Sequence, residues 1–334
     1  MKVFHKALVV TALCVSMVVG VTGCGKKPLD GTQTVATVGE KTMSLGEANF
    51  LLRYQQVQTE SYYESMLGEG IYKMDLYGDG STYGESLKKD VLDQMHEYYL
   101  LEEKAADYGV EVAEEEKTAI TEAAKAFLDA NDENAKAQMN ADQETVERIL
   151  TLMTIRNKMT KVIYGEADVT VTDDEAAQRG FSYVSVSKGS GENALSEEEL
   201  KENKDKLAAM IESVNGGNSM DAAAVEQGLS AYPGSYGLGT ESNYDEAVIT
   251  ALDTMTEGQV SDIIETDTEL YVVQLTAELD EAATESRRES LKATKQTEYM
   301  TSLLDTWKEE YPLTVEEAVW EQVVFDRSYE TKAE

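Results

Sequence analysis

Apolar side chains recur at steps of three and four residues through most of the first half of the chain, which is the spacing of one face of an α-helix. Ser44 and Glu47 have the spacing of a capping box at the start of the first such stretch. Gly109 is expected to end the second such stretch, over residues 87–108. We therefore predict a mainly helical domain over residues 35–168, with an irregular loop rich in Tyr and Gly over residues 62–84. The helices are expected over residues 44–57, 87–108, 113–130 and 143–163.

The pattern changes after residue 168, where strand-like stretches alternate with amphipathic helices. The expected order is strand, helix, helix, a Gly- and Tyr-rich loop over residues 228–243, helix, strand and strand. Few strands with segregated helices predict a compact α+β domain over residues 169–278. The stretches that carry these elements are "FSYVSVS" at 181–187, "LSEEELKENKDKLAAMIESV" at 195–214, "SMDAAAVEQ" at 219–227, "YDEAVITAL" at 244–252, "VSDIIET" at 260–266 and "ELYVVQL" at 269–275.

A long polar helix is predicted from Glu281 to Glu310, and Pro312 ends it. Its apolar face is narrow, so the helix would be poorly stable alone. We expect it to pack on the N-terminal helices, which returns residues 279–334 to the helical domain. The predicted fold class is α+β, with a small α+β domain inserted into a helical module. The apolar face consists of Leu291, Met300, Leu303, Leu304 and Trp307.

The N-terminus has the pattern of an export signal over residues 1–23. Lys2 and Lys6 precede an apolar run that is too short for a stable membrane span. The run ends in "VTGC", which resembles the lipobox of bacterial lipoproteins, where the cysteine is lipidated and becomes the new N-terminus. This resemblance implies lipid attachment at Cys24 and a chain held on the extracytoplasmic face of the cell membrane by residues 24–34, a soluble tether. An ordinary signal peptide with Cys24 free is the alternative.

Charge and composition exclude several classes of function. The chain carries 64 acidic and 29 basic residues, a net charge of −35, so nucleic acid should be repelled rather than bound. Cys14 and His5 lie in the predicted signal, which leaves one cysteine and one histidine, His96, in the exported chain. A disulfide framework, a histidine cluster and a histidine-activated nucleophile are therefore excluded. We expect His96 to lie on a helix flank, and the acidic clusters lack the spacing of a calcium loop.

Three stretches of the α+β domain resemble a parvulin-type peptidyl-prolyl isomerase domain. They are "YVSVS" at 183–187, "GSYGLG" at 234–239 and "TMTEGQVSDIIETDTELYVVQL" at 254–275. With the lipobox, the opening "VATVGEKTMSLGEANF" at 35–50 and the returning C-terminal helix, nearly the whole chain resembles PrsA-like and SurA-like extracytoplasmic foldases. The resemblance implies a helical chaperone module with an inserted parvulin-like domain.

Isomerising an X-Pro bond means twisting an amide over a barrier of roughly 18–20 kcal/mol without breaking a bond. The site must hold the proline ring in an apolar pocket, exclude water and favour the twisted amide through hydrogen bonds. It requires no metal and no cofactor, so we predict neither. In parvulins two facing histidines, a Cys or Asp, a Ser or Thr, and a pocket of Leu, Met and Phe carry this task.

Both family histidines are replaced in this chain. By position they fall on Tyr183 and Tyr271, while the family's hydroxyl is kept as Thr268. The Cys or Asp position falls on Leu229 or Ser230, so the loop has no clear acid or thiol. The resemblance implies a peptide groove that contains Tyr183, Thr268, Tyr271, Leu238 and, near the Met and Phe positions, Tyr244 and Val248.

We expect Tyr183 and Tyr271 to be neighbours on adjacent strands beneath the loop of residues 229–244. A phenol is one donor and acceptor with a pKa near 10, so a facing tyrosine pair cannot reproduce the linked tautomers of two imidazoles. Such a groove would bind a peptide without isomerising it efficiently. The alternative interpretation, that both tyrosines are ordinary core aromatics, stays open.

The leading functional hypothesis is a membrane-anchored extracytoplasmic folding factor that binds exported, unfolded polypeptides through the helical module and a degenerate parvulin domain. The first alternative is an active peptidyl-prolyl cis-trans isomerase. The second is a non-enzymatic lipoprotein scaffold or solute receptor, although receptors usually need two α/β lobes and the pattern gives one small sheet. Homodimer formation is left open.

Overall fold

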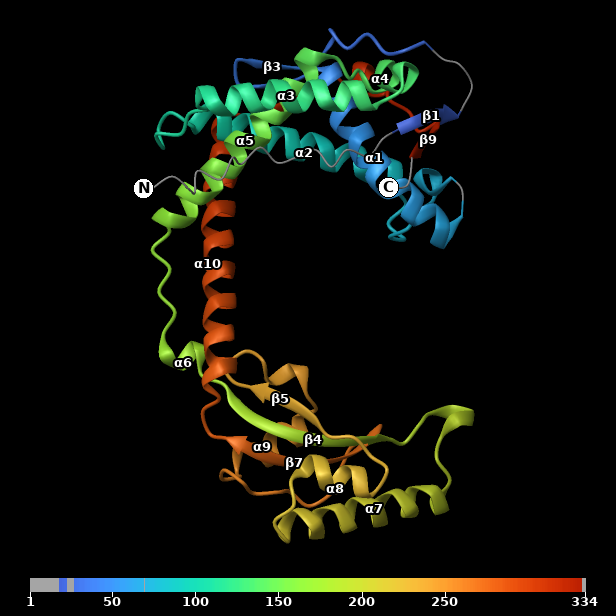
Figure 1. Ribbon diagram of the computed structural model, residues 1–334, viewed down its shortest axis with the longest axis vertical. Coiled ribbons are helices and arrows are strands. Elements are labelled where there is room, and N and C mark those ends of the chain that lie inside the picture. Colours follow the sequence, from blue (N-terminus) through green and yellow to red (C-terminus); the bar gives the residue numbers. More distant parts are fainter. Residues whose placement is uncertain (1–17, 23–26, 69, 332–334) are drawn as a thin grey trace. The chain divides into compact units, whose positions relative to one another are not determined.

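The computed structural model describes residues 18–22, 27–68 and 70–331. By internal contacts the chain forms two compact units, shown in Figure 1. The helical unit comprises the described residues up to Ala167 together with those from Glu298 onward. The inserted unit comprises Asp168–Thr297. Each unit is described by itself below.

Helix boundaries in the helical unit follow from side-chain caps. Ser44 accepts a hydrogen bond from the Glu47 amide, and the Glu47 carboxylate accepts one from the Ser44 amide, so the predicted capping box is present. Thr82 and Glu85 form a second box. The helices are α1 (Leu45–Leu67), α2 (Tyr83–Lys104), α3 (Glu114–Ala130), α4 (Glu133–Met139) and α5 (Gln143–Glu166), with a short 3-10 turn η1 (Ile71–Lys73) after α1.

The loop predicted over residues 62–84 is shorter than expected. Helix α1 continues to Leu67, and α2 begins at Tyr83. The predicted start of the loop was wrong, because a cluster of tyrosines does not end a helix. The chain turns only at Gly68, where φ is +90°.

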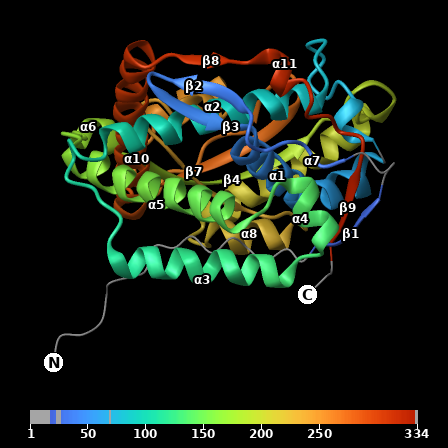
Figure 2. The same cartoon turned by 90° about the horizontal axis from the view of Figure 1, so that it is seen from above.

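One hydrophobic core joins the helices of this unit. Helices α3 and α5 lie side by side in Figure 2, and Phe127 of α3 meets Phe50 of α1 edge to face with ring centroids 5.5 Å apart. Two small sheets border the helices: a three-stranded sheet in the order β3-β2-β8 and a two-stranded sheet of β1 and β9. Their strands are β1 (Val18–Thr22), β2 (Thr34–Val38), β3 (Lys41–Ser44), β8 (Leu313–Val315) and β9 (Ser328–Thr331), and the short helix α11 (Glu317–Trp320) follows β8.

His96 is buried rather than placed on a helix flank. Its side chain lies on α2, and its Nε2 is 2.8 Å from the Tyr311 carbonyl oxygen. Burial lowers the pKa of His96, which favours the neutral ring. The residue ties the end of the C-terminal helix to α2 and therefore has a structural role.

The long helix α10 (Glu281–Glu310) forms as predicted. Its C-terminal part contributes Met300, Leu304 and Trp307 to the core of the helical unit. The fold is therefore α+β, with an inserted domain and a C-terminal helix that packs back on the helical module. By contacts the inserted unit ends at Thr297, inside α10, whereas the sequence placed its end at residue 278. The predicted domain boundaries stay a prediction.

The inserted unit contains a four-stranded antiparallel sheet in the order β5-β4-β7-β6. Strand β5 lies within the loop predicted over residues 228–243. The Pro233-Gly234 pair has the composition of a turn, but β5 is an edge strand, where proline is tolerated. The strands are β4 (Arg179–Ser187), β5 (Tyr232–Tyr236), β6 (Ile264–Glu265) and β7 (Glu269–Ala277); β6 is shorter than the strand predicted over residues 260–266.

Alternation along β4 and β7 gives this sheet a core on each face. Val184, Leu270 and Val272 face one side and pack with α7 (Glu197–Asn215) and α8 (Met220–Glu226). Phe181 and Val273 face the other side and pack with α9 (Glu246–Asp253). A short helix α6 (Asp173–Ala176) precedes β4, and two 3-10 turns, η2 (Gly191–Asn193) and η3 (Glu241–Asn243), lie in the connections.

The predicted export signal and lipid site fall largely outside the described residues. Cys24 is one of the residues that the structure does not describe. Val18–Thr22 form β1, which pairs with β9. Within the predicted tether, the Leu29 and Gly31 carbonyls accept hydrogen bonds from Asn140 and Gly46, so this part lies against the helical unit. None of the helices in the described residues is long and apolar enough to cross a membrane.

Candidate functional site

A groove of about 280 Å³ opens on the α9 side of the sheet in the inserted unit. Strands β4 and β7 form its floor, and η3 with the start of α9 forms one wall. The residues that line it are Phe181, Tyr183, Ser185, Asn243, Tyr244, Asp245, Val248, Glu269 and Tyr271.

Strand register brings the two substituted tyrosines together. In the antiparallel pair of β4 and β7, Ser185 lies opposite Tyr271 and Tyr183 lies opposite Val273. Residues opposite each other share a face, so Tyr183 and Tyr271 project to the same side as diagonal neighbours. The predicted placement of the two tyrosines on adjacent strands and one face is confirmed. The loop of residues 229–244 does not cover them as predicted, because β5 lies in the sheet itself and only Asn243 and Tyr244 of this segment line the groove. Both are half-buried at the edge of the core on this face.

The wall beside them is fixed by the start of α9. The Asp245 carboxylate caps this helix by accepting a hydrogen bond from the Ala247 amide at 2.9 Å. Tyr244, the residue before the cap, packs edge-on against Phe181 with ring centroids 4.9 Å apart. Val248, three residues after the cap, is buried in the core on this face of the sheet. The helix start therefore sets the position of one aromatic ring and one carboxylate in the groove.

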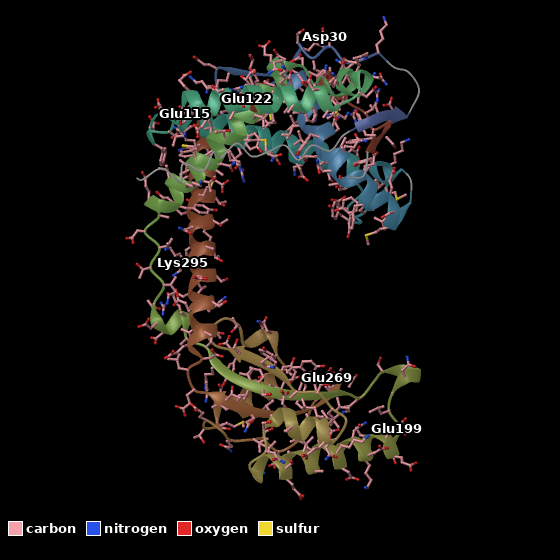
Figure 3. The ribbon with its side chains drawn as sticks, viewed as in Figure 1. Asp30, Glu115, Glu122, Glu199, Glu269 and Lys295 are labelled. Carbon is pink, nitrogen blue, oxygen red and sulfur yellow. The ribbon has the colours of Figure 1, made fainter. Side chains whose placement is uncertain are left out.

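The electrostatics of the groove are acidic. Asp245 and Glu269 contribute carboxylates to its lining, and Glu269 is labelled on the inserted unit in Figure 3. Burial raises the pKa of Tyr271, and so do a hydrogen bond to Glu269 and the negative charges of Glu269 and Asp245. The phenol therefore stays protonated throughout the physiological range.

Two of the residues predicted for the groove do not line it. Thr268 is exposed in the turn between β6 and β7, where its carbonyl accepts a hydrogen bond from the Lys188 amide at 2.7 Å. Leu238 is 62% exposed in the loop after β5. The structure thus brings together Tyr183, Tyr244, Val248 and Tyr271, with Thr268 and Leu238 outside the lined groove.

The position expected for the family's Cys or Asp is also outside the groove. Leu229 packs against the core on the opposite face of the sheet, with α7 and α8. Ser230 is exposed. Neither residue is therefore placed to act with Tyr183 or Tyr271.

Sequence reasoning missed the polar part of the lining. Ser185 and Glu269 lie two residues from Tyr183 and Tyr271 along their strands, so strand alternation alone places them on the same face. This signal was available in the sequence. Asp245 carries no such signal, because only the docking of α9 on the sheet brings it near Glu269.

This lining limits the chemistry of the groove. Among the residues that line it in the described part of the chain, none carries an imidazole or a thiol. Phenols and carboxylates can accept hydrogen bonds and attract cations, but they do not supply the linked imidazole tautomers of the family site. The volume is just below the range of pockets for drug-sized ligands, so the groove suits a single side chain of a longer molecule.

A second pocket, of about 460 Å³, lies in the helical unit between the N-termini of α1 and α5. Arg148, which lines this pocket, forms ion pairs with Glu47 and Glu102. Burial opposes the charge of Arg148, but hydrogen bonds and the charge of Glu102 prevail and raise the pKa of Arg148. These contacts tie α5 to α1 and α2, which is a structural role. The described residues contain no group of three or more His, Cys, Asp or Glu side chains able to hold a metal ion.

Two protein-family descriptions match the chain. A SurA-like N-terminal domain matches residues 1–141, and a PPIC-type PPIASE domain matches residues 172–286. The second match spans both strands and the helix that build the groove. No curated protein matches the chain.

Several solved structures are similar to the chain at low identity. A SurA-like chaperone of Campylobacter jejuni is 11% identical with a TM-score of 0.30, covering 84% of this chain and 98% of its own. The foldase protein PrsA of Streptococcus pneumoniae is 18% identical with a TM-score of 0.32, covering 75% and 97%. PrsA of Bacillus subtilis is 13% identical with a TM-score of 0.23, covering 84% and 93%. The domain assignment rests on the family matches: the chain combines a SurA-like N-terminal domain with a PPIC-type peptidyl-prolyl isomerase domain.

Proposed function

We propose that the protein is a membrane-anchored extracytoplasmic folding factor that binds unfolded, exported polypeptides, and that its parvulin-like groove binds without efficient isomerisation. A proline-containing segment would lie across Tyr183, Tyr244, Val248 and Tyr271. Thr268 and Leu238, both exposed, would contact a segment that extends past the lined groove.

The observation that carries this proposal is the pair of phenols on one face of β4 and β7. The groove keeps apolar and aromatic surface for a side chain, which favours binding. It offers hydrogen-bond groups that do not relay a proton between two rings, so the twisted amide gains little over the planar one. Binding of both states to a similar extent does not accelerate rotation.

The helical unit supports the binding part of the proposal. Several large apolar side chains near the end of α1 and in the loop that follows are exposed, and two of them are tyrosines, which also carry a polar hydroxyl. Tyrosine gives broad contact area at low cost in conformational entropy, which suits the binding of varied unfolded chains. These side chains are Tyr62, Met66, Leu67 and Tyr77, which are 62%, 64%, 49% and 67% exposed.

Membrane anchoring is the part of the proposal that rests on the N-terminal sequence. The "VTGC" stretch supports lipid attachment at Cys24 after removal of residues 1–23. Each buried methylene adds about 0.8 kcal/mol to membrane affinity, so a multiply acylated terminus stays bound. The net charge of −35 supports a partner other than nucleic acid.

The test measures two activities on one sample of the chain without residues 1–23. The first is suppression of aggregation of a denatured secreted protein, and the second is acceleration of proline-limited refolding of a test substrate. We expect suppression of aggregation with little acceleration. Acceleration without suppression would overturn the proposal, above all if Tyr183→Phe or Tyr271→Phe abolished it.

A further inference from the structure

The groove of the inserted unit combines aromatic side chains with acid groups. The rings of Phe181, Tyr183 and Tyr244 pack against one another. The centroid distances are 4.9 Å between Phe181 and Tyr244 and 6.3 Å between Tyr183 and Tyr244. Tyr271 completes this aromatic lining from β7. The faces of aromatic rings attract cations. A neutral side chain can pack on the same rings but does not gain this charge attraction.

The two carboxylates of the groove have no cationic partner in the described part of the chain. The ion pairs of that part include neither Asp245 nor Glu269. The basic residues at the two ends of β4 are occupied elsewhere: Lys188 pairs with Glu265, and Arg179 donates to the Leu252 and Met255 carbonyls. Two acids therefore face the same small volume without a positive charge to balance them.

We propose that this groove is a specificity pocket for the side chain of a lysine or arginine in an extended polypeptide. The cation would lie over the aromatic rings, and its hydrogen-bond donors would reach the carboxylates of Glu269 and Asp245. Tyr271, two residues from Glu269 along β7, would line the same pocket. The inference names the substrate feature of the same groove and rests on its proposed role in binding polypeptides.

The size of the groove and the net charge of the protein fit this ligand. A volume of about 280 Å³ is enough for one long side chain and too small for a folded partner. A net charge of −35 steers cationic segments toward the protein and raises their rate of encounter. The overall charge acts at long range and is sensitive to salt, whereas the aromatic contact acts only in the groove.

The experiment uses the chain without residues 1–23 and a set of fluorescent peptides of one extended, otherwise uncharged sequence. The central residue is lysine, arginine, norleucine or glutamate, and binding is measured by fluorescence anisotropy. We expect the lysine and arginine peptides to bind about tenfold more tightly than the norleucine peptide, the combined effect of a cation–aromatic contact and an ion pair. The glutamate peptide should bind least.

Two substitutions locate the preference. Glu269→Gln and Asp245→Asn each remove one charge from the groove, and asparagine keeps the cap of α9. Each should reduce the preference for lysine over norleucine by several-fold, with unchanged thermal unfolding. Glu198→Gln is the matched control, because it removes the same charge from an exposed position on α7, on the opposite face of the sheet.

The outcomes separate this inference from the proposed function. Loss of the lysine preference in the groove variants, but not in Glu198→Gln, supports the inference. Equal binding of the lysine and norleucine peptides, weakened by Tyr183→Ala, would overturn the cation preference and leave a peptide-binding groove. A lysine preference reduced equally by Glu198→Gln would assign it to overall charge and overturn the inference. Peptide binding that no groove variant alters would overturn both.

Discussion

Tyr271 differs from an imidazole in what it can do with a proton. A histidine ring passes a proton between two nitrogens near neutral pH, whereas this phenol has a pKa raised further by burial and by Glu269. Its hydroxyl therefore stays protonated near neutral pH. At the scale of single residues, the groove keeps aromatic surface and hydrogen-bonding groups. It lacks a ring that passes a proton between two atoms near neutral pH, as an imidazole does.

Gly234 makes room for the ring of Phe181, which lines the groove. It lies opposite Phe181 in the pairing of β4 with β5, and a Cβ atom at this position would lie 2.5 Å from the Phe181 ring. Gly234→Ala should push this ring toward Tyr244 and cost about 1–3 kcal/mol of unfolding free energy. Urea unfolding measures the cost.

The control for Gly234→Ala is Ser235→Ala, the next residue on the same strand, whose side chain alternates to the other face. We expect Ser235→Ala to stay near the parent stability. Equal stability of the parent and of Gly234→Ala would show that the ring has room to move and would contradict the packing described above.

At the scale of elements, regular periodicity predicted the long helices well and the irregular segments poorly. Helix α10 was predicted with its observed bounds, because its apolar positions keep one spacing and Pro312 follows it. Strand β5 was missed because Pro233 and Gly234 favour a turn unless an edge position accepts them. Thr268 was expected at the groove, but it lies before β7 begins, in the turn that leads into this strand.

The site was predictable to the extent that it depends on strand alternation. Tyr183 and Tyr271 could be placed from their strands alone, and Glu269 could have been placed by the same rule. Asp245 could not, because its position depends on how α9 docks on the sheet. Contacts made by docking have no local signature in a single sequence.

The short helix α6 is tied to α10 by an ion pair with a pH dependence. Lys295 bonds to Glu175 at 2.9 Å, and Glu175 also caps α6 by accepting from the Thr172 amide. The hydrogen bond from Lys295 is the largest of the contacts that lower the pKa of Glu175 to about 2. An unfolded glutamate has a pKa of about 4.3.

Because the folded pKa of Glu175 is the lower one, its contribution is fully present above about pH 4.3 and is lost as the pH falls toward 2. Glu175→Gln should remove this contribution at neutral pH. The measurement is the unfolding midpoint in urea at pH 7, 4 and 3, for parent and variant. The difference between the two proteins should shrink as the pH falls, and a difference that grew on acidification would be inconsistent with this pairing.

At the scale of the whole molecule, the chain is expected to remain with the membrane through Cys24. Under the proposed anchoring, replacing Cys24 should leave the fold intact and release the protein, because the acyl chains supply the membrane affinity. Cys24→Ala should therefore move the protein from the membrane fraction to the soluble extracytoplasmic fraction, with loss of labelling by radioactive fatty acid. Labelling that persisted in Cys24→Ala would place the lipid elsewhere.

The most direct test of the central claim is exchange spectroscopy by NMR on an X-Pro peptide in the presence of the chain without residues 1–23. It reports binding and cis–trans exchange of the peptide in one experiment. We predict that the protein shifts or broadens the peptide signals while the rate of exchange stays at its value in buffer. Faster exchange, returned to the buffer value by Tyr183→Phe or Tyr271→Phe, would contradict the claim that this groove binds without isomerising.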